Sequence, residues 1–457
     1  MKITALTALL FLLLVQPAQT QNIYRTACQG NQERLDSLLQ NTNINTQDNR
    51  GRSLLHWAVA CGKPAIFEHL VAQGIQTDVR DEDGATPLYM AVRFQQEALY
   101  DRLVGLLETA TWKSRDAGML YEKAVLNNDL DFVQKLQESG LSVNATNERG
   151  STPLEIALRL QNDSIANWLK ANGANTQLVR QITAKGPYMG QRPPTDARKV
   201  FAPNFISTEE YEFGSVFNKA GDEFYYGVDT GHGNEIRFSQ LVQGEWTAPK
   251  TILAHPKYGY NDPFLSQDEQ RLYFISNQAM DGQGAAKDID IWYVERQDDG
   301  WSMPINAGPM INSDKEEYYI SFTNSGTLFF STDKGQSHHD IYYSEFVNGT
   351  YQQPVKLSEA INTEHYEADV FVDPNEAYLI FCAQRPEGMG RGDLYISFKQ
   401  EDGSWSPSVN MGATINTQGH ELCPFVTHDG KYLLYTSNQD IYWAPTSLFL
   451  ELAPRKR

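Results

Sequence analysis

Acidic side chains recur at matched places in the C-terminal half of this 457-residue chain. Glu212, Glu317, Glu367 and Glu421 each stand nine residues before a turn position, and Tyr260 takes the same place in a fifth unit. If these segments are the inner strands of one closed ring, the four carboxylates converge near its mouth. Such a ring could hold Ca²⁺, which takes about six to eight oxygen ligands. The alternative is structural, with each Glu accepting backbone N–H bonds between units.

Two histidines directly precede this pattern: His365 and His420 lie just before Glu367 and Glu421. Imidazole and carboxylate together are the ligand types of a transition-metal site. The sequence has no His-Glu-x-x-His pair, no Gly-x-Ser-x-Gly turn and no phosphate-binding Gly-rich loop ending in Lys-Ser/Thr. The candidate metal ligands, for Ca²⁺ or a transition metal, are therefore Glu212, Glu317, Glu367, Glu421, His365 and His420. No other cofactor and no catalytic residue are expected.

The segments that carry these residues form a repeat of about fifty residues. After each turn comes an aromatic-rich strand: "EFYY", "RLYFIS", "TLFFST", "AYLIF" and "KYLLYTS". An acidic residue then opens a third strand, and turns such as "GEWTAP" and "GSWSP" begin a fourth. Four short strands per unit, rich in aromatic and β-branched residues, are typical of a propeller blade. The repeated Ile-Asn-Thr of "INTEHYE" and "INTQGHE" then marks the crossing from one blade to the next.

Five units contain the first three strands, but four contain the fourth. The segment "KVFAPNFIST", from Lys199, precedes the first blade and resembles the missing outer strand with its return loop. We therefore predict five blades, closed by an N-terminal strand that completes the C-terminal blade. Residues 199–445 resemble the TolB-like propeller family in stretches such as "THDGKYLLYTS" and "NSGTLFFST". This resemblance implies a WD-like repeat fold in an exported bacterial protein, and implies no particular activity.

The N-terminal half has a different period. "SLLHWA", "TPLYMA" and "TPLEIA" begin at residues 53, 86 and 152, separated by 33 and twice 33, and the weaker "MLYEKA" at 119 fills the gap. This spacing resembles the ankyrin repeat, a turn and two helices that stack into a solenoid. Its turn tips carry Asp81, Glu82, Asp83 and Glu148, which either meet a basic protein partner or are simply solvated.

The predicted organisation is a multidomain α + β protein with five parts. They are a signal peptide (1–20), ankyrin repeats (22–178), a Pro- and Gly-containing linker (179–198), the propeller (199–445) and a C-terminal helix or tail (446–457). The first part has the short apolar core of a secretory signal, and no other stretch approaches the ~18 apolar residues of a membrane helix. The mature chain is thus expected to be periplasmic or secreted.

The formal charge of −19 argues against nucleic-acid binding, because an acidic chain repels phosphates. The four cysteines, Cys28, Cys61, Cys382 and Cys423, are expected to be free. Neighbouring repeats lie roughly 10 Å apart, whereas a disulfide needs Cα atoms within ~7 Å. Since ankyrin arrays and propellers are interaction modules, the leading function is a protein-binding scaffold of the cell envelope. The alternative is a periplasmic lyase or hydrolase acting on an acidic oligosaccharide or peptide with a metal in the channel.

Overall fold

A computed structural model of the chain describes residues 20–82, 84–107, 111–298, 300–333 and 338–453. The chain divides into two compact units, residues 1–181 and 182–457. Apart from Thr20, the predicted signal peptide lies outside the described residues, as does Asp83 of the predicted acidic tips. No helix in the described part of the chain is long and apolar enough to span a bilayer.

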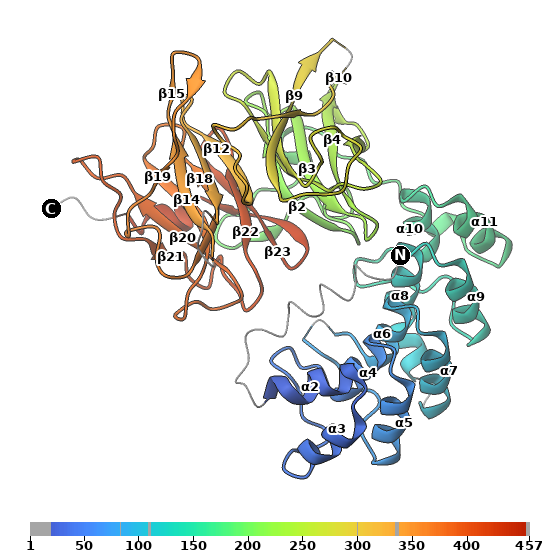
Figure 1. Ribbon diagram of the computed structural model, residues 1–457. Helices are drawn as coiled ribbons and strands as arrows, with labels where there is room; N and C mark the ends of the chain where they lie inside the picture. The colour runs from blue at the N-terminus through green and yellow to red at the C-terminus, as the bar shows by residue number, and fades with distance from the viewer. Residues whose placement is uncertain (1–19, 83, 108–110, 299, 334–337, 454–457) are drawn as a thin grey trace. The chain divides into compact units, whose positions relative to one another are not determined.

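The first unit is a stack of helix pairs, which follow one another from α2 (blue) to α11 (green) in Figure 1. The helices are α2 (Thr20–Gln29), α3 (Gln32–Leu39), α4 (Leu54–Ala60), α5 (Pro64–Ala72), α6 (Pro87–Arg93), α7 (Glu97–Leu106), α8 (Thr111–Leu126), α9 (Leu130–Glu138), α10 (Pro153–Arg159) and α11 (Asp163–Ala171). A short 3₁₀ turn, η1 (Thr176–Leu178), follows. The predicted ankyrin solenoid is confirmed, and one continuous apolar core runs through all five pairs.

The repeated Thr-Pro-Leu explains where the first helices begin. The Thr86 side chain accepts the Tyr89 N–H at 3.2 Å, and Thr152 does the same for Glu155 at 3.2 Å. Proline then occupies the first helical position, where its missing N–H costs nothing. The Thr-Pro pattern therefore fixes where α6 and α10 begin.

The cysteine prediction is wrong for the first pair: Cys28 and Cys61 form a disulfide, with Cα atoms 5.2 Å apart. The spacing of roughly 10 Å applies to helix axes, and each Cα lies about 2.3 Å from its axis. Two Cα atoms on facing sides of neighbouring helices therefore come within bridging distance. Cys382 and Cys423 are free and buried, as expected.

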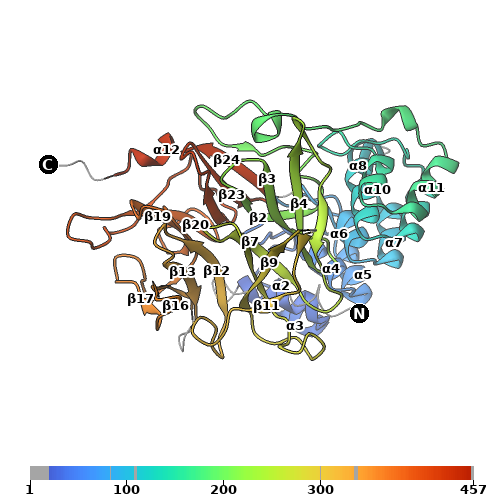
Figure 2. The same cartoon turned by 90° about the horizontal axis from the view of Figure 1, so that it is seen from above.

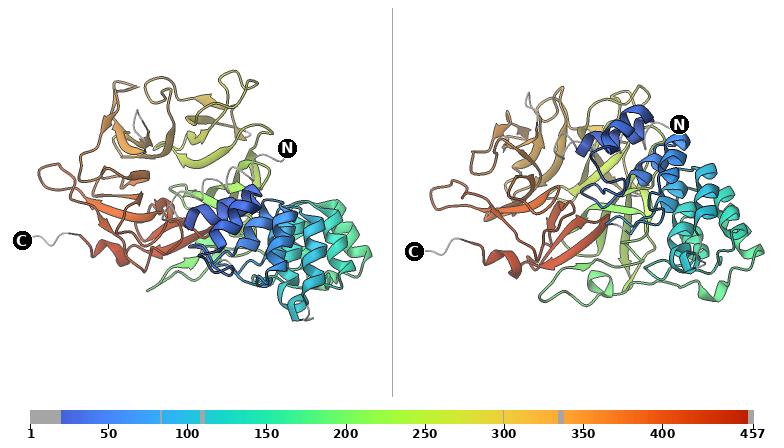
Figure 3. Two further views of the ribbon diagram at one scale, coloured as in Figure 1. Left: turned by 60° about the horizontal axis from the view of Figure 1, so that its bottom comes forward. Right: turned by 90° about the horizontal axis from the view of Figure 1, so that it is seen from below.

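The second unit consists of five antiparallel sheets that follow one another round an axis, coloured from green to red in Figures 1 and 3. Each inner strand contacts the inner strands of the blades before and after it. Blade one holds β2 (Tyr211–Phe217), β3 (Glu223–Asp229), β4 (Asn234–Val242), β5 (Glu245–Trp246) and β6 (Lys250–Leu253), and blade two holds β7 (Tyr260–Leu265), β8 (Arg271–Ser276), β9 (Asp290–Gln297), β10 (Gly300–Trp301) and β11 (Ile305–Asn306). Blade three holds β12 (Glu317–Phe322), β13 (Leu328–Thr332), β14 (Asp340–Ser344) and β17 (Val355–Lys356), with the hairpin β15 (Phe346–Val347) and β16 (Thr350–Tyr351). Blade four holds β18 (Tyr366–Val372), β19 (Tyr378–Gln384), β20 (Asp393–Phe398) and β21 (Val409–Asn410).

The fifth blade confirms the predicted closure. Its strands β22 (Leu422–Val426), β23 (Tyr432–Ser437) and β24 (Asp440–Pro445) are completed by β1 (Lys199–Val200), which pairs antiparallel with β24. The Phe201 N–H extends the ladder to the Ile441 carbonyl at 2.8 Å. Figure 2 shows β23 and β24 beside the first blade, so the ring has no open edge at the junction. The short helix α12 (Ser447–Leu450) follows.

The segment predicted as a linker, residues 179–198, packs on the propeller from Ile182 onward, around the 3₁₀ turn η2 (Pro187–Gly190). Trp246 of blade one donates its backbone N–H to the Ala184 carbonyl and its indole N–H to the Gly186 carbonyl, both at 2.8 Å. The Tyr188 ring packs edge-on against Phe217 of blade one and lies beside Trp443 of blade five. This segment therefore packs against blades one and five, the two blades that meet where the ring closes.

Candidate functional site

The four ring glutamates are all fully buried and have the same local partners. Glu367 accepts the backbone N–H of Thr363 at 3.0 Å and its hydroxyl at 2.7 Å. The same two bonds, from the Ser or Thr four residues earlier, reach Glu212 from Thr208, Glu317 from Ser313 and Glu421 from Thr417. Each carboxylate thus holds the loop by which the chain enters its own blade.

The backbone and the neighbouring Asn join this loop to the preceding blade. The N–H of Glu367 donates to the His339 carbonyl at 3.0 Å, and the other three glutamates bond the preceding blade in the same way. Asn362 binds the Ile341 N–H at 2.7 Å and its carbonyl at 2.9 Å, and Asn312 and Asn416 repeat this on Ile291 and Leu394. The Ile-Asn-Thr/Ser sequence is therefore a clasp between blades, which favours the structural alternative.

The four glutamates differ in what surrounds the carboxylate. Glu367 forms a buried ion pair with Arg385 at 3.0 Å. Burial raises the pKa of Glu212 to about 8, although the bonds from Thr208 oppose this shift. Burial also raises the pKa of Glu317 to about 7. At neutral pH, two positions thus favour a protonated or partly protonated acid, which is a poor ligand for a hard cation.

The two predicted histidines, His365 and His420, do not converge on one metal position. His365 donates its backbone N–H to Thr363, and its ring lies 4.0 Å from Glu364. The His420 Nε2 atom lies 3.5 Å from the Cys382 sulfur. Across the described residues, no three His, Cys, Asp or Glu side chains are grouped as a metal ion requires. The metal site stays a prediction that the observed hydrogen bonds do not favour.

A second ring, which no side-chain pattern in the sequence reveals, lies two residues further along every inner strand. Its members are all in the left-handed backbone region, with φ between 46° and 53°: Gly214, Asp262, Tyr319, Asp369 and Cys423. In each inner strand the pairing register shifts at this place, so the strand bulges. Non-glycine residues in this region cost about 1–3 kcal/mol each, and such strain clusters at functional sites.

These bulges meet at the axis. The Cys423 thiol of blade five donates to the Asp262 carboxylate of blade two at 3.2 Å, and the Tyr319 hydroxyl of blade three donates to the Pro424 carbonyl at 2.8 Å. A Cβ on Gly214 would stand 2.4 Å from the Asp262 Oδ1 atom, so blade one admits only glycine there. At this level the channel is therefore filled by side chains from blades two to five and by the glycine backbone of blade one.

Burial changes the ionisation of the acids in this axial ring and of the Cys382–His420 pair. Burial raises the pKa of Asp262 to about 6 and that of Asp369 to about 7, the latter with added repulsion from Asp262. Burial also raises the pKa of the Cys382 thiol well above its usual value and lowers the pKa of His420 to about 4. The Cys382–His420 pair therefore stays neutral at pH 7 and does not supply a thiolate nucleophile.

The opposite end of the inner strands forms a cavity of about 400 Å³. Its floor is aromatic and comes from four blades: Phe264, Phe322, Phe371 and Phe425. Its rim is made by the turns that follow the inner strands, including Lys219, Glu269, Asn324, Asp373 and Asn375. A cavity of this size with an apolar floor and a few polar groups has the form of a small-molecule site.

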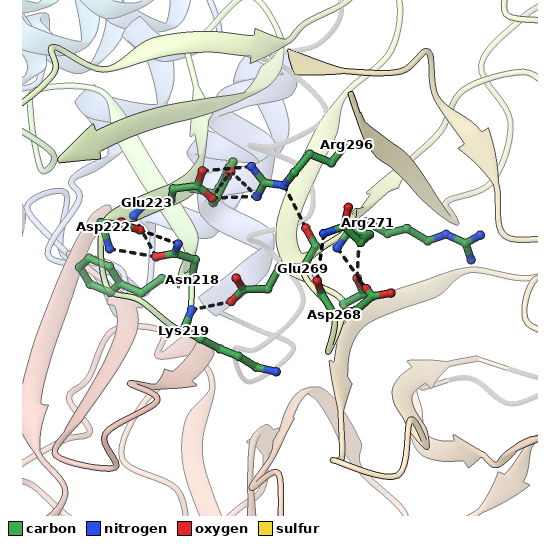
Figure 4. Close-up of polar contacts among 12 residues, drawn as sticks. Asn218, Lys219, Asp222, Glu223, Asp268, Glu269, Arg271 and Arg296 are labelled. Atoms are coloured by element: carbon green, nitrogen blue, oxygen red, sulfur yellow. Dashed lines mark hydrogen bonds and ion pairs between the residues drawn. The ribbon is translucent and has the colours of Figure 1, made fainter. Parts of the chain in front are cut away.

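An ion pair and a hydrogen bond join blades one and two beside this cavity (Figure 4). Arg296 of blade two makes two bonds to the Glu223 carboxylate of blade one, at 2.8 and 3.0 Å. Glu269 reaches back from blade two to accept the backbone N–H of Lys219 in blade one. The turns at this face are thus fixed by contacts between blades rather than by local sequence alone.

The ankyrin tips form a separate candidate surface within the first unit. Asp81, predicted as an exposed acid, is buried and accepts the Ala85 N–H at 2.8 Å, so it closes its own turn. Asp48 and Asn147 close their turns in the same way. Glu82 and Glu148 remain exposed at the tips.

The family that matches this chain covers part of the first unit. Residues 23–110 match the family described as ankyrin repeats (3 copies). The chain is 30% identical over 133 residues to a putative ankyrin repeat protein of Acanthamoeba polyphaga mimivirus, covering 25% of this chain and 18% of that protein. It is 31% identical over 169 residues to human Rabankyrin-5, covering 35% of this chain and 14% of that protein. It is 26% identical over 166 residues to the potassium channel AKT2/3 of Arabidopsis thaliana, covering 36% of this chain and 20% of that channel. The chain thus spans a fifth or less of each of these relatives.

Proposed function

We propose that this protein is an exported scaffold of the cell envelope whose ankyrin tips bind a protein partner with a basic surface. The observation that carries the proposal is the set of closed turn tips, which hold Glu82 and Glu148 outward on a rigid stack. A pre-ordered surface loses little conformational entropy on binding. Ankyrin repeats in general present such tips to other proteins.

Export is supported by the Cys28–Cys61 disulfide, because such bonds persist in oxidising compartments and are rare in the cytosol. The TolB-like resemblance of the propeller, inferred from its strand and turn sequences, points to the same setting. Expression of the full chain followed by mass measurement of the mature N-terminus tests this part. Cleavage after about residue 20 and a linked 28–61 peptide are expected, whereas an uncleaved chain with reduced thiols would contradict export.

The partner is tested by charge reversal at the tips, with Glu82→Lys and Glu148→Lys combined. Glu33→Lys and Glu138→Lys on the second helices α3 and α9 make a matched control, since both side chains are exposed acids of the same unit. Proteins crosslinked to the exported wild-type chain are purified and their affinities measured for all three forms. Binding that is lost in the tip variant and kept in the control supports the proposal. Equal binding by both variants places the interface elsewhere.

A further inference from the structure

We infer that the axial cavity of the propeller binds a small organic cation, an ammonium group carried on an apolar body. The first observation is the cavity itself, about 400 Å³ in volume and lined by residues of all five blades. The inner strands run toward it in parallel, so each blade contributes the end of one strand and the turn that follows. Because these turns are bonded across blades, the cavity is formed before any ligand arrives.

The floor selects an apolar body. Phe264 packs against Phe322 and Phe425, and Phe425 packs against Phe371, at ring-centre distances of 5.9–6.0 Å. The four rings therefore form one aromatic floor. Val216 and Val426 add to the same floor. A purely polar or inorganic ligand would leave the phenyl rings exposed to water. An aryl or alkyl group would bind more favourably, by about 25 cal/mol for each Å² of apolar surface that it buries.

The rim selects positive charge. Two carboxylates, Glu269 and Asp373, line it against a single Lys or Arg among the described lining residues, Lys219. The Lys219 ammonium already donates to the Gln267 carbonyl. Burial lowers the pKa of His428, which keeps that ring neutral at pH 7. The rim therefore has a net negative charge.

The wider electrostatic field has the same sign. Residues 182–457 contain 38 Asp and Glu against 21 Lys and Arg, so nearly all of the chain's negative charge belongs to this unit. A cleft lined by one sign of charge concentrates ligands of the opposite sign. An amphipathic amine meets the apolar floor and the acidic rim together, whereas a fatty or aromatic acid meets only the floor.

The test is calorimetric titration of the full chain with octylammonium at 150 mM salt, with octanoate and octanol as matched ligands of the same chain length. We expect saturable one-to-one binding of octylammonium, weaker binding of octanol and the weakest binding of octanoate. Equal binding of the three ligands, or tighter binding of octanoate, overturns the inference. The absence of any saturable octylammonium binding overturns it as well.

Two rim variants locate the site. Glu269→Gln keeps the shape of the side chain and should weaken octylammonium binding about fivefold, while Lys219→Gln should strengthen it by a similar factor. Glu245→Gln and Lys257→Gln are controls, since both are exposed and lie outside the cavity lining, and Lys257 donates to the Gln283 carbonyl as Lys219 does to Gln267. Melting temperatures equal to wild type confirm that the variants are folded. If the controls change the affinity as much as the rim variants, the cation binds elsewhere and the inference fails.

Discussion

Replacing Glu212 by Gln tests whether this residue is a buried neutral acid or an ionised ligand for a cation. The Glu212 carboxyl is fully buried, and its pKa is raised from an ordinary 4.5 to about 8, chiefly by desolvation. A group with a raised folded-state pKa stabilises the fold fully below its unfolded pKa, and this stability is lost as the pH rises through the folded pKa. Each pKa unit corresponds to 1.36 kcal/mol. Between pH 5 and 8 the propeller should therefore lose about 3 kcal/mol through this one group.

Glutamine keeps an acceptor oxygen for the Thr208 N–H but has no proton to lose. Glu212→Gln should thus match wild type within about 1 kcal/mol at pH 5 and exceed its stability by about 3 kcal/mol at pH 8. Urea unfolding of the full chain at pH 5, 6.5 and 8, followed by tryptophan fluorescence, measures the difference. The ankyrin unit is identical in both proteins, so it cancels. A variant that is destabilised by the same amount at every pH would refute the reasoning, since the folded carboxyl would then be ionised throughout.

Glu367→Gln is the matched comparison, because the same loop bonds are present and Arg385 is added. Removing the carboxylate leaves the buried Arg385 guanidinium without its counter-charge, which costs about 3–5 kcal/mol. At pH 8, Glu367→Gln should therefore lose stability where Glu212→Gln gains it. The prediction that the ring glutamates bind Ca²⁺ is tested by measuring the melting temperature of the same proteins in millimolar Ca²⁺. We expect a flat titration, whereas a melting temperature that rises with Ca²⁺ more than with Mg²⁺, and less so in Glu367→Gln, would establish the cation site.

Three further perturbations follow from the fold. Replacing Cys28 and Cys61 together by Ser should lower the free energy of unfolding of the ankyrin unit by about 4 kcal/mol, the loop-closure value for a loop of 33 residues; a melting temperature unchanged from wild type, by calorimetry under oxidising conditions, would contradict this. Gly214→Ala should destabilise the propeller by at least about 1–2 kcal/mol, because φ is +47° and the new Cβ would meet Asp262; urea unfolding should show this, and Gly221→Ala, which has a similar φ but open space, is the steric control. Deleting residues 195–208 removes β1 and should yield oligomers by light scattering, whereas a monomer with unchanged stability would argue that closure does not depend on that strand.

Much of the fold could be predicted from the sequence because both units repeat. Aligning the repeats shows which residues occupy equivalent positions in each helix pair or blade. Counting four outer strands against five inner ones was sufficient to locate β1 opposite β24. The clasp formed by Asn362, Thr363 and Glu367 was recognisable for the same reason, since each blade needs identical side chains at its crossing.

The axial ring could not be found in this way. Its five positions share a backbone conformation, but Gly, Asp, Tyr, Asp and Cys share no side-chain type. A left-handed bulge leaves a signal in the sequence only where glycine is required, as at Gly214. The role of Asp81 was missed because an exposed acid and a turn-closing acid look alike in a polar loop, and only the bond from the Ala85 N–H distinguishes them.

The closing strand also determines how force would travel through the protein. Chain connectivity between the two units passes through the segment that ends in β1, and that segment is bonded to blade one at Trp246 and to blade five through β24. Any tension applied by a partner that holds the ankyrin unit must act first on these contacts. The junction that closes the propeller is therefore the first part of the ring that such tension would load.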